Sequence, residues 1–151
     1  MSKFTQEEKT NIVLENILNR KSVRHYLEGK KIPDAKIQIL LKAGMAAPSA
    51  RNIQPWEFII VDDRDILDKL AERNTYGKML FSASHAIIVA GNTDKMGEHK
   101  DFWQQDAAAA TQNIMLMAES MGLGSVWIGV YPKEDRIQIA KDELNLPDNI
   151  I

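Results

Sequence analysis

The sequence predicts an α+β fold in which a central mixed sheet lies between two layers of helices, a three-layer α/β/α arrangement. Two observations support this fold class. Apolar, β-branched runs typical of strands occupy residues 56–61, 86–90 and 125–130, and segments with apolar residues at helical spacing precede and separate them. The resulting order (helix, helix, strand, helix, strand, helix, strand, helix) is typical of a sheet covered by helices.

The first two elements are predicted to be helices. Between residues 7 and 19, four apolar side chains recur at helical spacing: Ile12, Val13, Ile17 and Leu18. A second helix is expected over residues 34–46, between Pro33 and Pro48. The polar residues between the two helices interrupt the periodicity.

Two strands with a short helix between them come next. Residues 56–61 are aromatic and β-branched and end at Asp62 and Asp63, which predicts a strand. A short helix follows at about residues 66–70. The continuous apolar run 86–90 is typical of a strand that is buried on both faces.

A long helix is predicted from Asp101, as its cap, to Met121, with Gly122 as the glycine that ends it. Small residues and methionines surround much of its circumference. It is therefore either central in its own domain or packed against another subunit, and the sequence leaves both open. A third strand (125–130), a last helix (133–144) and the beginning of a strand (149–151) complete the chain.

Composition limits the class of protein. The 151 residues fit one domain and 44% of them are hydrophobic. The net charge of −2 excludes a strong overall cationic field for nucleic-acid binding, though not a local basic pocket. The absence of cysteine excludes disulfides, thiolate catalysis and cysteine-bound metals. The first ten residues are polar and no apolar run approaches the ~20 residues of a membrane span, so we expect a cytoplasmic protein that does not bind membranes.

The familiar side-chain chemistries are missing. The segment Gly122-Leu123-Gly124 lacks the third glycine of a dinucleotide fingerprint, no P-loop or G-x-S-x-G motif occurs, and the three histidines are scattered rather than paired for a metal. We therefore expect no metal site and no catalytic side chain. If the protein is an enzyme, a cofactor supplies the chemistry.

Three segments are candidates for binding such a cofactor. The first, Arg20-Lys21-Ser22-Val23-Arg24, places two arginines around a hydroxyl, which suits a phosphomonoester. The alternative is a solvated basic helix end, where cations are favoured by the helix dipole.

The second segment covers residues 47–56 and is rich in Ser, Asn and Gln, which offer neutral donors and acceptors to a planar heterocycle. Its two prolines restrict the loop and reduce the entropy lost on binding. The alternative is an ordinary polar connection, with Trp56 anchoring the following strand in the core.

The third segment covers residues 121–132. Gly129, at the end of the predicted strand, would let the backbone approach a ring closely. The alternative, a helix-ending glycine followed by a buried strand, accounts for Gly122 and Gly124 but accounts less well for Gly129.

Together and in this order, the three segments resemble the signatures of the FMN-dependent nitroreductase family. These are an Arg-(Arg/Lys)-Ser-x-Arg opening, a Pro-Ser-x-x-Asn-x-Gln-Pro-Trp loop and a Gly-Leu-Gly-Ser-x-Trp-Ile-Gly strand. The resemblance extends from about Asn11 to Ile151. It implies a nitroreductase-like fold and a homodimer with FMN at the subunit interface.

The resemblance assigns each segment a role. The phosphate, ribityl chain and pyrimidine edge of FMN would be held by Arg20, Lys21, Ser22 and Arg24. The opposite side of the same flavin would be lined from the other subunit by Pro48, Ser49, Ala50 and Asn52, with Gln54 as a weaker member. The backbone near flavin N5 would come from Trp127, Ile128 and Gly129. The helix of residues 106–121 would form the dimer core.

The implied reaction is ping-pong hydride transfer from NADH or NADPH through FMN to nitroaromatics, quinones or similar small acceptors. The alternative is a dimeric module that binds FMN with little or no turnover. Family members usually continue beyond a position like Ile151 with a strand that reaches into the partner's sheet. Residues 1–151 are therefore expected to form a single FMN-binding domain without that strand.

Overall fold

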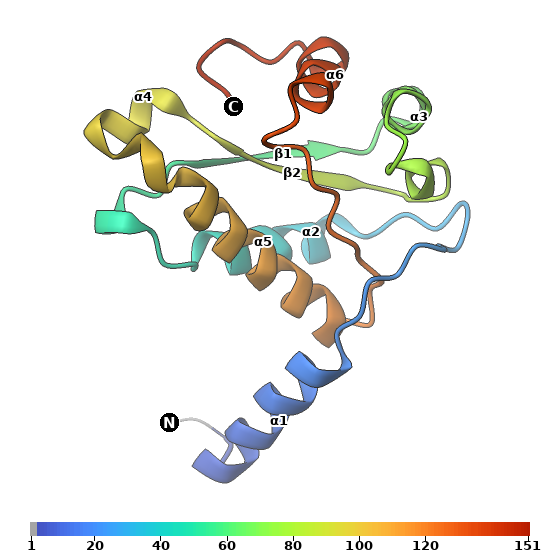
Figure 1. Ribbon diagram of the computed structural model, residues 1–151. Helices are drawn as coiled ribbons and strands as arrows, with labels where there is room; N and C mark the ends of the chain where they lie inside the picture. The colour runs from blue at the N-terminus through green and yellow to red at the C-terminus, as the bar shows by residue number, and fades with distance from the viewer. Residues whose placement is uncertain (1–2) are drawn as a thin grey trace.

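The computed structural model describes residues 3–151 (Figure 1). The helices are α1 (Gln6–Asn19), α2 (Asp34–Met45), α3 (Arg64–Arg73), α4 (Thr93–Met96), α5 (Trp103–Ser120) and α6 (Glu134–Leu144). Three short 3-10 turns are η1 (Ala50–Asn52), η2 (Lys78–Phe81) and η3 (Gly97–Phe102). The two strands are β1 (Trp56–Val61) and β2 (Ala86–Gly91).

The strands β1 and β2 pair antiparallel, with Trp56 opposite Gly91 and Val61 opposite Ala86. Because side chains alternate along a strand, each face of this pair is covered by a different set of helices. Ile59 and Ile88 pack with α3 and α6 on one face, whereas Phe58 and Ile87 pack with α2 and α5 on the other. Figure 1 shows these helices above and below the strands, which confirms the three-layer arrangement.

The predicted third strand is wrong. Residues 125–130 are extended, but only one parallel bridge, Ser22 with Ser125, connects them to a neighbour. Two later carbonyl groups of the segment accept hydrogen bonds that do not come from a neighbouring strand. Gly129 O accepts from the Arg136 side chain, and Val130 O accepts from the Lys133 N–H. A strand needs a continuous backbone partner, and this segment has none among the described residues.

The end of the chain, where the sequence predicted the beginning of a strand, contacts the end of β2 without forming a strand. Ile151 exchanges two backbone hydrogen bonds with Gly91, at 2.7 and 2.9 Å, beside a bridge between Asn92 and Ile150. Residues 149–151 therefore lie beside the C-terminal end of β2.

The long helix α5 ends as predicted and begins differently. Gly122 has a φ of +69°, Gly122 N–H donates to Glu119 O, and Leu123 N–H donates to Ala118 O, the pattern of a glycine-terminated helix. At the other end, Asp101 does not cap the helix. The turn η3 runs directly into Trp103, and the preceding residue, Phe102, provides no side-chain cap.

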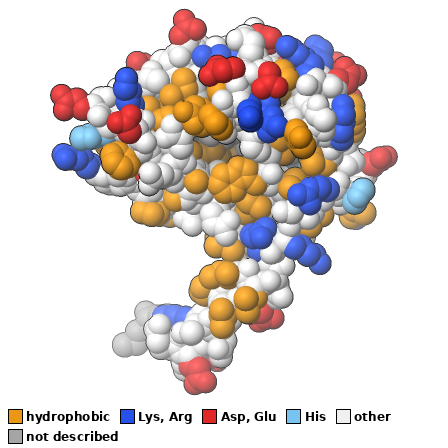
Figure 2. All heavy atoms as spheres, in the orientation of Figure 1, with side chains coloured by type: hydrophobic (Ala, Val, Ile, Leu, Met, Phe, Trp, Pro, Cys, Tyr) orange, Lys and Arg blue, Asp and Glu red, His pale blue; other side chains and the backbone are white. Residues whose placement is uncertain are grey.

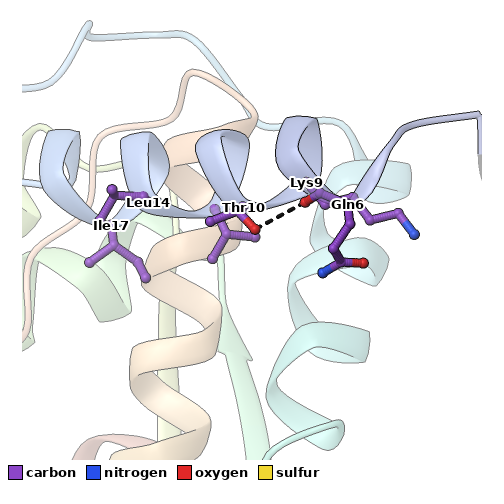
Figure 3. A pocket seen from close by; sticks show the side chains of 6 residues that line it. Gln6, Lys9, Thr10, Leu14 and Ile17 are labelled. Atoms are coloured by element: carbon purple, nitrogen blue, oxygen red, sulfur yellow. Dashed lines mark hydrogen bonds between the residues drawn. The ribbon is translucent and has the colours of Figure 1, made fainter.

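Helix α1 differs from all the others in its position. It projects from the body of the molecule (Figures 1 and 2), and none of its 14 residues is buried. A capping box between Thr5 and Glu8 fixes its beginning, and these two hydrogen bonds lower the pKa of Glu8. A shallow hollow of about 430 Å³ runs along one side of the helix and is lined by α1 residues alone (Figure 3): Gln6, Lys9, Thr10, Val13, Leu14 and Ile17.

Candidate functional site

The first and third segments lie side by side just beyond the C-terminal end of α5. Val23 N–H donates to Ser125 O at 2.9 Å, next to the parallel bridge between Ser22 and Ser125. A β-carbon at Gly124 would lie 2.9 Å from Cγ1 of Val23, so glycine is required for this close approach. Two of the three segments predicted to bind a cofactor are thus in contact in the fold.

A hollow of about 260 Å³ opens where the two segments meet. Its lining combines Arg24 of the first segment with the third segment and with side chains from η2, from the turn before it and from α6: Arg24, Tyr76, Met79, Val126, Trp127, Ile128, Gly129 and Arg136. Both arginines bring positive charge to this hollow, and Trp127 is 47% exposed, so its ring is accessible. The hollow can therefore accept a flat molecule that carries an anionic or electron-rich edge.

Arg24 is placed by its surroundings at the edge of this hollow. Tyr26, two residues on, is tied to the chain by donation from its hydroxyl to Val23 O at 2.7 Å. Burial raises the pKa of the Tyr26 hydroxyl, and the positive charge of Arg24 opposes that increase. Arg24 is exposed and makes no side-chain hydrogen bond or ion pair with another described residue.

The other polar residues of the first segment are also accessible. Arg20 is half-buried and follows α1 directly as its C-cap, whereas Lys21 and Ser22 are exposed. Arg20 thus occupies the helix-end position that the alternative interpretation requires. Neither Arg20 nor Lys21 forms an ion pair within residues 3–151, so both charges are available to an external anion.

The second segment lies elsewhere. None of its residues lines the hollow, and Figure 1 shows the loop around η1 on the opposite side of the molecule. Its Ala50 N–H donates to Asp106 in the first turn of α5, whereas the first and third segments meet beyond the last turn of this 18-residue helix, which is about 27 Å long. One chain therefore does not bring all three segments together.

The loop itself has an unusual backbone. Arg51, Asn52 and Gln54 all have φ between +52° and +56°, a conformation that side chains with a β-carbon disfavour. Gln54 N–H donates to Ser49 Oγ at 2.9 Å, and the Gln54 side chain donates to Asn52 Oδ1 at 3.1 Å. Pro48, Asn52 and Gln54 are exposed, while Ser49 and Ala50 are half-buried, so the loop presents polar groups outward. Trp56, only 5% exposed, anchors the following strand as expected.

The sequence did not single out Arg136, which lines the hollow, or Asp106, which contacts the loop of residues 48–54. Arg136 donates to Gly129 O at 2.7 Å, and its guanidinium lies 4.6 Å from the centre of the Tyr76 ring. An arginine in the first turn of a helix resembles any solvated residue, so no local signal distinguishes it. Asp106 did have a signal, because it is the single charged residue between Asp101 and Glu119.

Gly129 lies where the chain leaves open space. A β-carbon at Gly129 would meet open space, so packing within the chain does not require glycine there. The predicted role of Gly129 toward a ring stays a prediction.

Within the described part of the chain, no group of His, Asp and Glu side chains is arranged to hold a metal ion. Nor is any helix of residues 3–151 long and apolar enough to cross a bilayer.

Comparison with known proteins decides the family. The model of the nitroreductase family matches residues 17–76 and 71–151. The chain belongs to the nitroreductase family.

Relatives and solved structures agree with this assignment. A relative from Archaeoglobus fulgidus, whose name carries the words NADH dehydrogenase and NAD(P)H nitroreductase, is 46% identical over 138 residues, which are 91% of this chain and 79% of the relative. A similarly named crystal structure from Parabacteroides distasonis is 52% identical, with a TM-score of 0.87 over 93% of this chain and 81% of that one. An FMN-dependent nitroreductase from Clostridium difficile R20291 is 31% identical, with a TM-score of 0.82 over 91% of this chain and 80% of that one. The expected nitroreductase-like fold is confirmed.

Proposed function

We propose that this nitroreductase-family protein is an FMN-dependent oxidoreductase that takes hydride from NADH or NADPH and passes it, by a ping-pong sequence, to nitroaromatics, quinones or similar small acceptors. The observation that carries the proposal is the hollow lined jointly by Arg24 and by Trp127, Ile128 and Gly129. A solved relative from Desulfovibrio desulfuricans, 31% identical with a TM-score of 0.78 over 91% of this chain and 79% of that one, is a complex with FMN. We further propose that residues 1–151 act as one FMN-binding domain, in the cytoplasm.

The chain's own residues fit the chemistry of FMN. Its phosphate carries about −1.5 to −2 charges at neutral pH, and the accessible cations Arg20 and Lys21 would hold it together with the Ser22 hydroxyl. Arg24, at the hollow, would stabilise negative charge at the pyrimidine edge. The open space at Gly129 leaves room for a ring against the backbone. The bound flavin supplies the two-electron hydride transfer, and no side-chain acid or base is required.

We propose that the complete site contains two copies of the chain. The loop of residues 48–54 lies away from the hollow of its own chain, so Pro48, Ser49, Ala50, Asn52 and Gln54 would line the flavin bound to the partner. The exposed apolar side chains of α1 support the same arrangement, because a group of exposed apolar side chains on one element is typical of an interaction surface. The half-exposed face of α5 would continue this interface.

The test of FMN binding is replacement of Arg20 by Ala. The variant is expected to purify with much less FMN per chain than the wild type, while its urea unfolding midpoint changes little, because Arg20 makes no ion pair with another described residue. Lys31→Ala removes an exposed cation outside the segment and is the matched control. A fully flavin-loaded Arg20→Ala protein would show the phosphate assignment to be wrong.

A measurement of nucleotide oxidation distinguishes the proposed oxidoreductase from a module that only binds FMN. Oxidation of NADPH or NADH by the flavin-loaded protein, with a nitroaromatic or a quinone present, is expected to proceed at many cycles per flavin. A yellow dimer that oxidises no nucleotide under these conditions would instead be the FMN-binding module without turnover.

A further inference from the structure

Asp106 is a buried carboxylate that the proposed chemistry does not use. Its side chain is 7% exposed, and it is the one charged residue that is buried among residues 3–151. Its Oδ1 accepts the Ala50 N–H at 2.9 Å, across 56 residues of sequence. A buried carboxylate is costly unless it is hydrogen-bonded, so this interaction has a structural or functional reason.

The partner of Asp106 is the loop that would line the flavin. Every other hydrogen bond described for residues 49–54 is made within the loop, as in the bond from Asn52 N–H to Ser49 O. Asp106 therefore provides the only described hydrogen bond from outside to these residues. The loop also holds three non-glycine residues at positive φ, which such residues adopt only where the surroundings impose it.

We propose that Asp106 is a positioning residue: its carboxylate fixes the turn at Ala50 so that Ser49 and Asn52 are held ready for the cofactor of the partner subunit. This inference rests on the proposed function. Asp106 touches no cofactor in this arrangement and acts through the backbone of the loop. A preorganised loop loses less entropy on binding than a mobile one, so removal of the anchor weakens FMN binding.

The test compares FMN affinity in full-length variants, measured by quenching of flavin fluorescence. Asp106→Ala removes the acceptor and is expected to raise the FMN dissociation constant about ten- to hundred-fold, the usual effect of losing a hydrogen bond to a charged group. Asp106→Asn keeps Oδ1 as an acceptor and is expected to restore affinity to within about three-fold of the wild type. A merely structural defect would not show this rescue.

A matched control lies on the same helix. Asn113 of α5 donates to Ala43 O at 3.1 Å, so it anchors α2 rather than the loop. Asn113→Ala is expected to lower the melting temperature of the protein while leaving the FMN dissociation constant within about three-fold of the wild type, since the loop keeps its anchor.

A second variant removes the same hydrogen bond from the other side. Ala50 is the first residue of η1 and Ser49 before it is extended, with φ −138° and ψ 154°, so Ala50→Pro fits the backbone and deletes the N–H donor. It should weaken FMN binding as Asp106→Ala does, and it replaces that variant if the latter does not fold. The double variant should be no weaker than either single one.

The outcomes are distinct. Wild-type affinity in Asp106→Ala or Ala50→Pro, or an equal loss in Asn113→Ala, overturns the positioning role while leaving the proposed function intact. A wild-type chain that does not bind FMN contradicts the proposed function itself, and the positioning role with it.

Discussion

Helices α1 and α5 are both rich in apolar residues, but only one of them is covered by its own chain. Seven of the 18 residues of α5 are buried, against none of the 14 residues of α1. Ile114 on α5 is 8% exposed, whereas Ile17 on α1 is 47% exposed and Leu18 is 73% exposed. Helical periodicity predicts that an apolar face will be buried, and the comparison shows that it does not say by which chain.

The packing of the two helices explains the difference. Helix α5 lies between α2 and the strands, where Ile114 packs with Ile37 and Leu40. Helix α1 is fastened near its C-terminal end, where the Asn16 side chain donates to Leu116 O at 2.9 Å, and the rest of it extends away from the body (Figure 1). The hollow along this projecting part (Figure 3) belongs to the surface that we propose is covered by a second copy.

The largest expected effect comes from truncating one isoleucine in each helix. Ile114→Ala leaves a cavity in the core and is expected to lower the free energy of unfolding by about 2–5 kcal/mol in urea denaturation of a dilute, dissociated sample. Ile17→Ala should change the same quantity by no more than about 0.5 kcal/mol. Equal losses in the two variants would mean that α1 is buried in the isolated chain.

The second largest effect is expected on the association of two copies of the chain through α1. The double variant Val13→Glu, Ile17→Glu places two charges in the apolar hollow of α1 and is expected to raise the dimer dissociation constant at least about hundred-fold, because buried unpaired charges are strongly disfavoured. Analytical ultracentrifugation measures this directly. Glu15→Lys, at an exposed α1 position outside the hollow, is the control and should leave the dimer intact.

A smaller effect on the unfolding free energy is expected from the residue that ends α5, which differs from the residue that ends α1. Gly122, at a φ of +69°, ends α5, whereas α1 ends at Arg20 without a glycine. Gly122→Ala forces a β-carbon into the left-handed region and should cost about 1 kcal/mol of unfolding free energy. Gly124→Ala gives a useful contrast, since it clashes with Val23 and should also disturb the hollow. If Gly122→Ala were neutral, the glycine would not be what terminates α5.

The smallest effect concerns pH and the body of the protein. Hydrogen bonds from Lys95 and Asn92 lower the pKa of Glu57 on β1. A lowered pKa means that this group stabilises the fold fully above the ordinary glutamate pKa, and that the contribution is lost as the pH falls through the lowered value.

Glu57→Gln should therefore reduce the decrease of the unfolding free energy as the pH falls toward 3. The expected change is a few tenths of a kcal/mol, because the ion pair is largely exposed. Urea unfolding from about pH 3 to 7 measures it, with Glu28→Gln as the charge-matched control. An unchanged slope would show that the pair does not form in solution.

Local patterns in the sequence were sufficient for most of the fold. Helix propensity, Gly122 and the apolar runs at 56–61 and 86–90 are signals carried by neighbouring residues, and the elements they predicted are present. The prediction of a third strand was wrong because strand formation depends on a partner that is distant in sequence. Within the described residues, the segment 125–130 has one isolated bridge, to Ser22, and no continuous partner strand. Helix α1 was predicted correctly, but its exposure depends on tertiary contacts that periodicity does not encode.

Part of the candidate site was also predictable from local motifs, and the other part depends on tertiary contacts. The motifs identified the three segments, and the contact of Val23 with Ser125 joins two of them. The remaining lining residues are Tyr76, Met79 and Arg136, and they come from segments whose local sequence is ordinary, so only the fold could place them there. The roles of the individual residues toward FMN stay predictions.

The separation of the 48–54 loop from the hollow of its own chain has a genetic consequence. In a mixed pair formed by an Arg20→Ala chain and an Ala50→Pro chain, one cleft inherits both lesions while the other receives an intact half from each parent. Each mixed pair would then have about half of the activity of a wild-type pair. Because random pairing makes about half of all pairs mixed, co-expression of the two alleles would recover about a quarter of the wild-type activity, a case of intersubunit complementation.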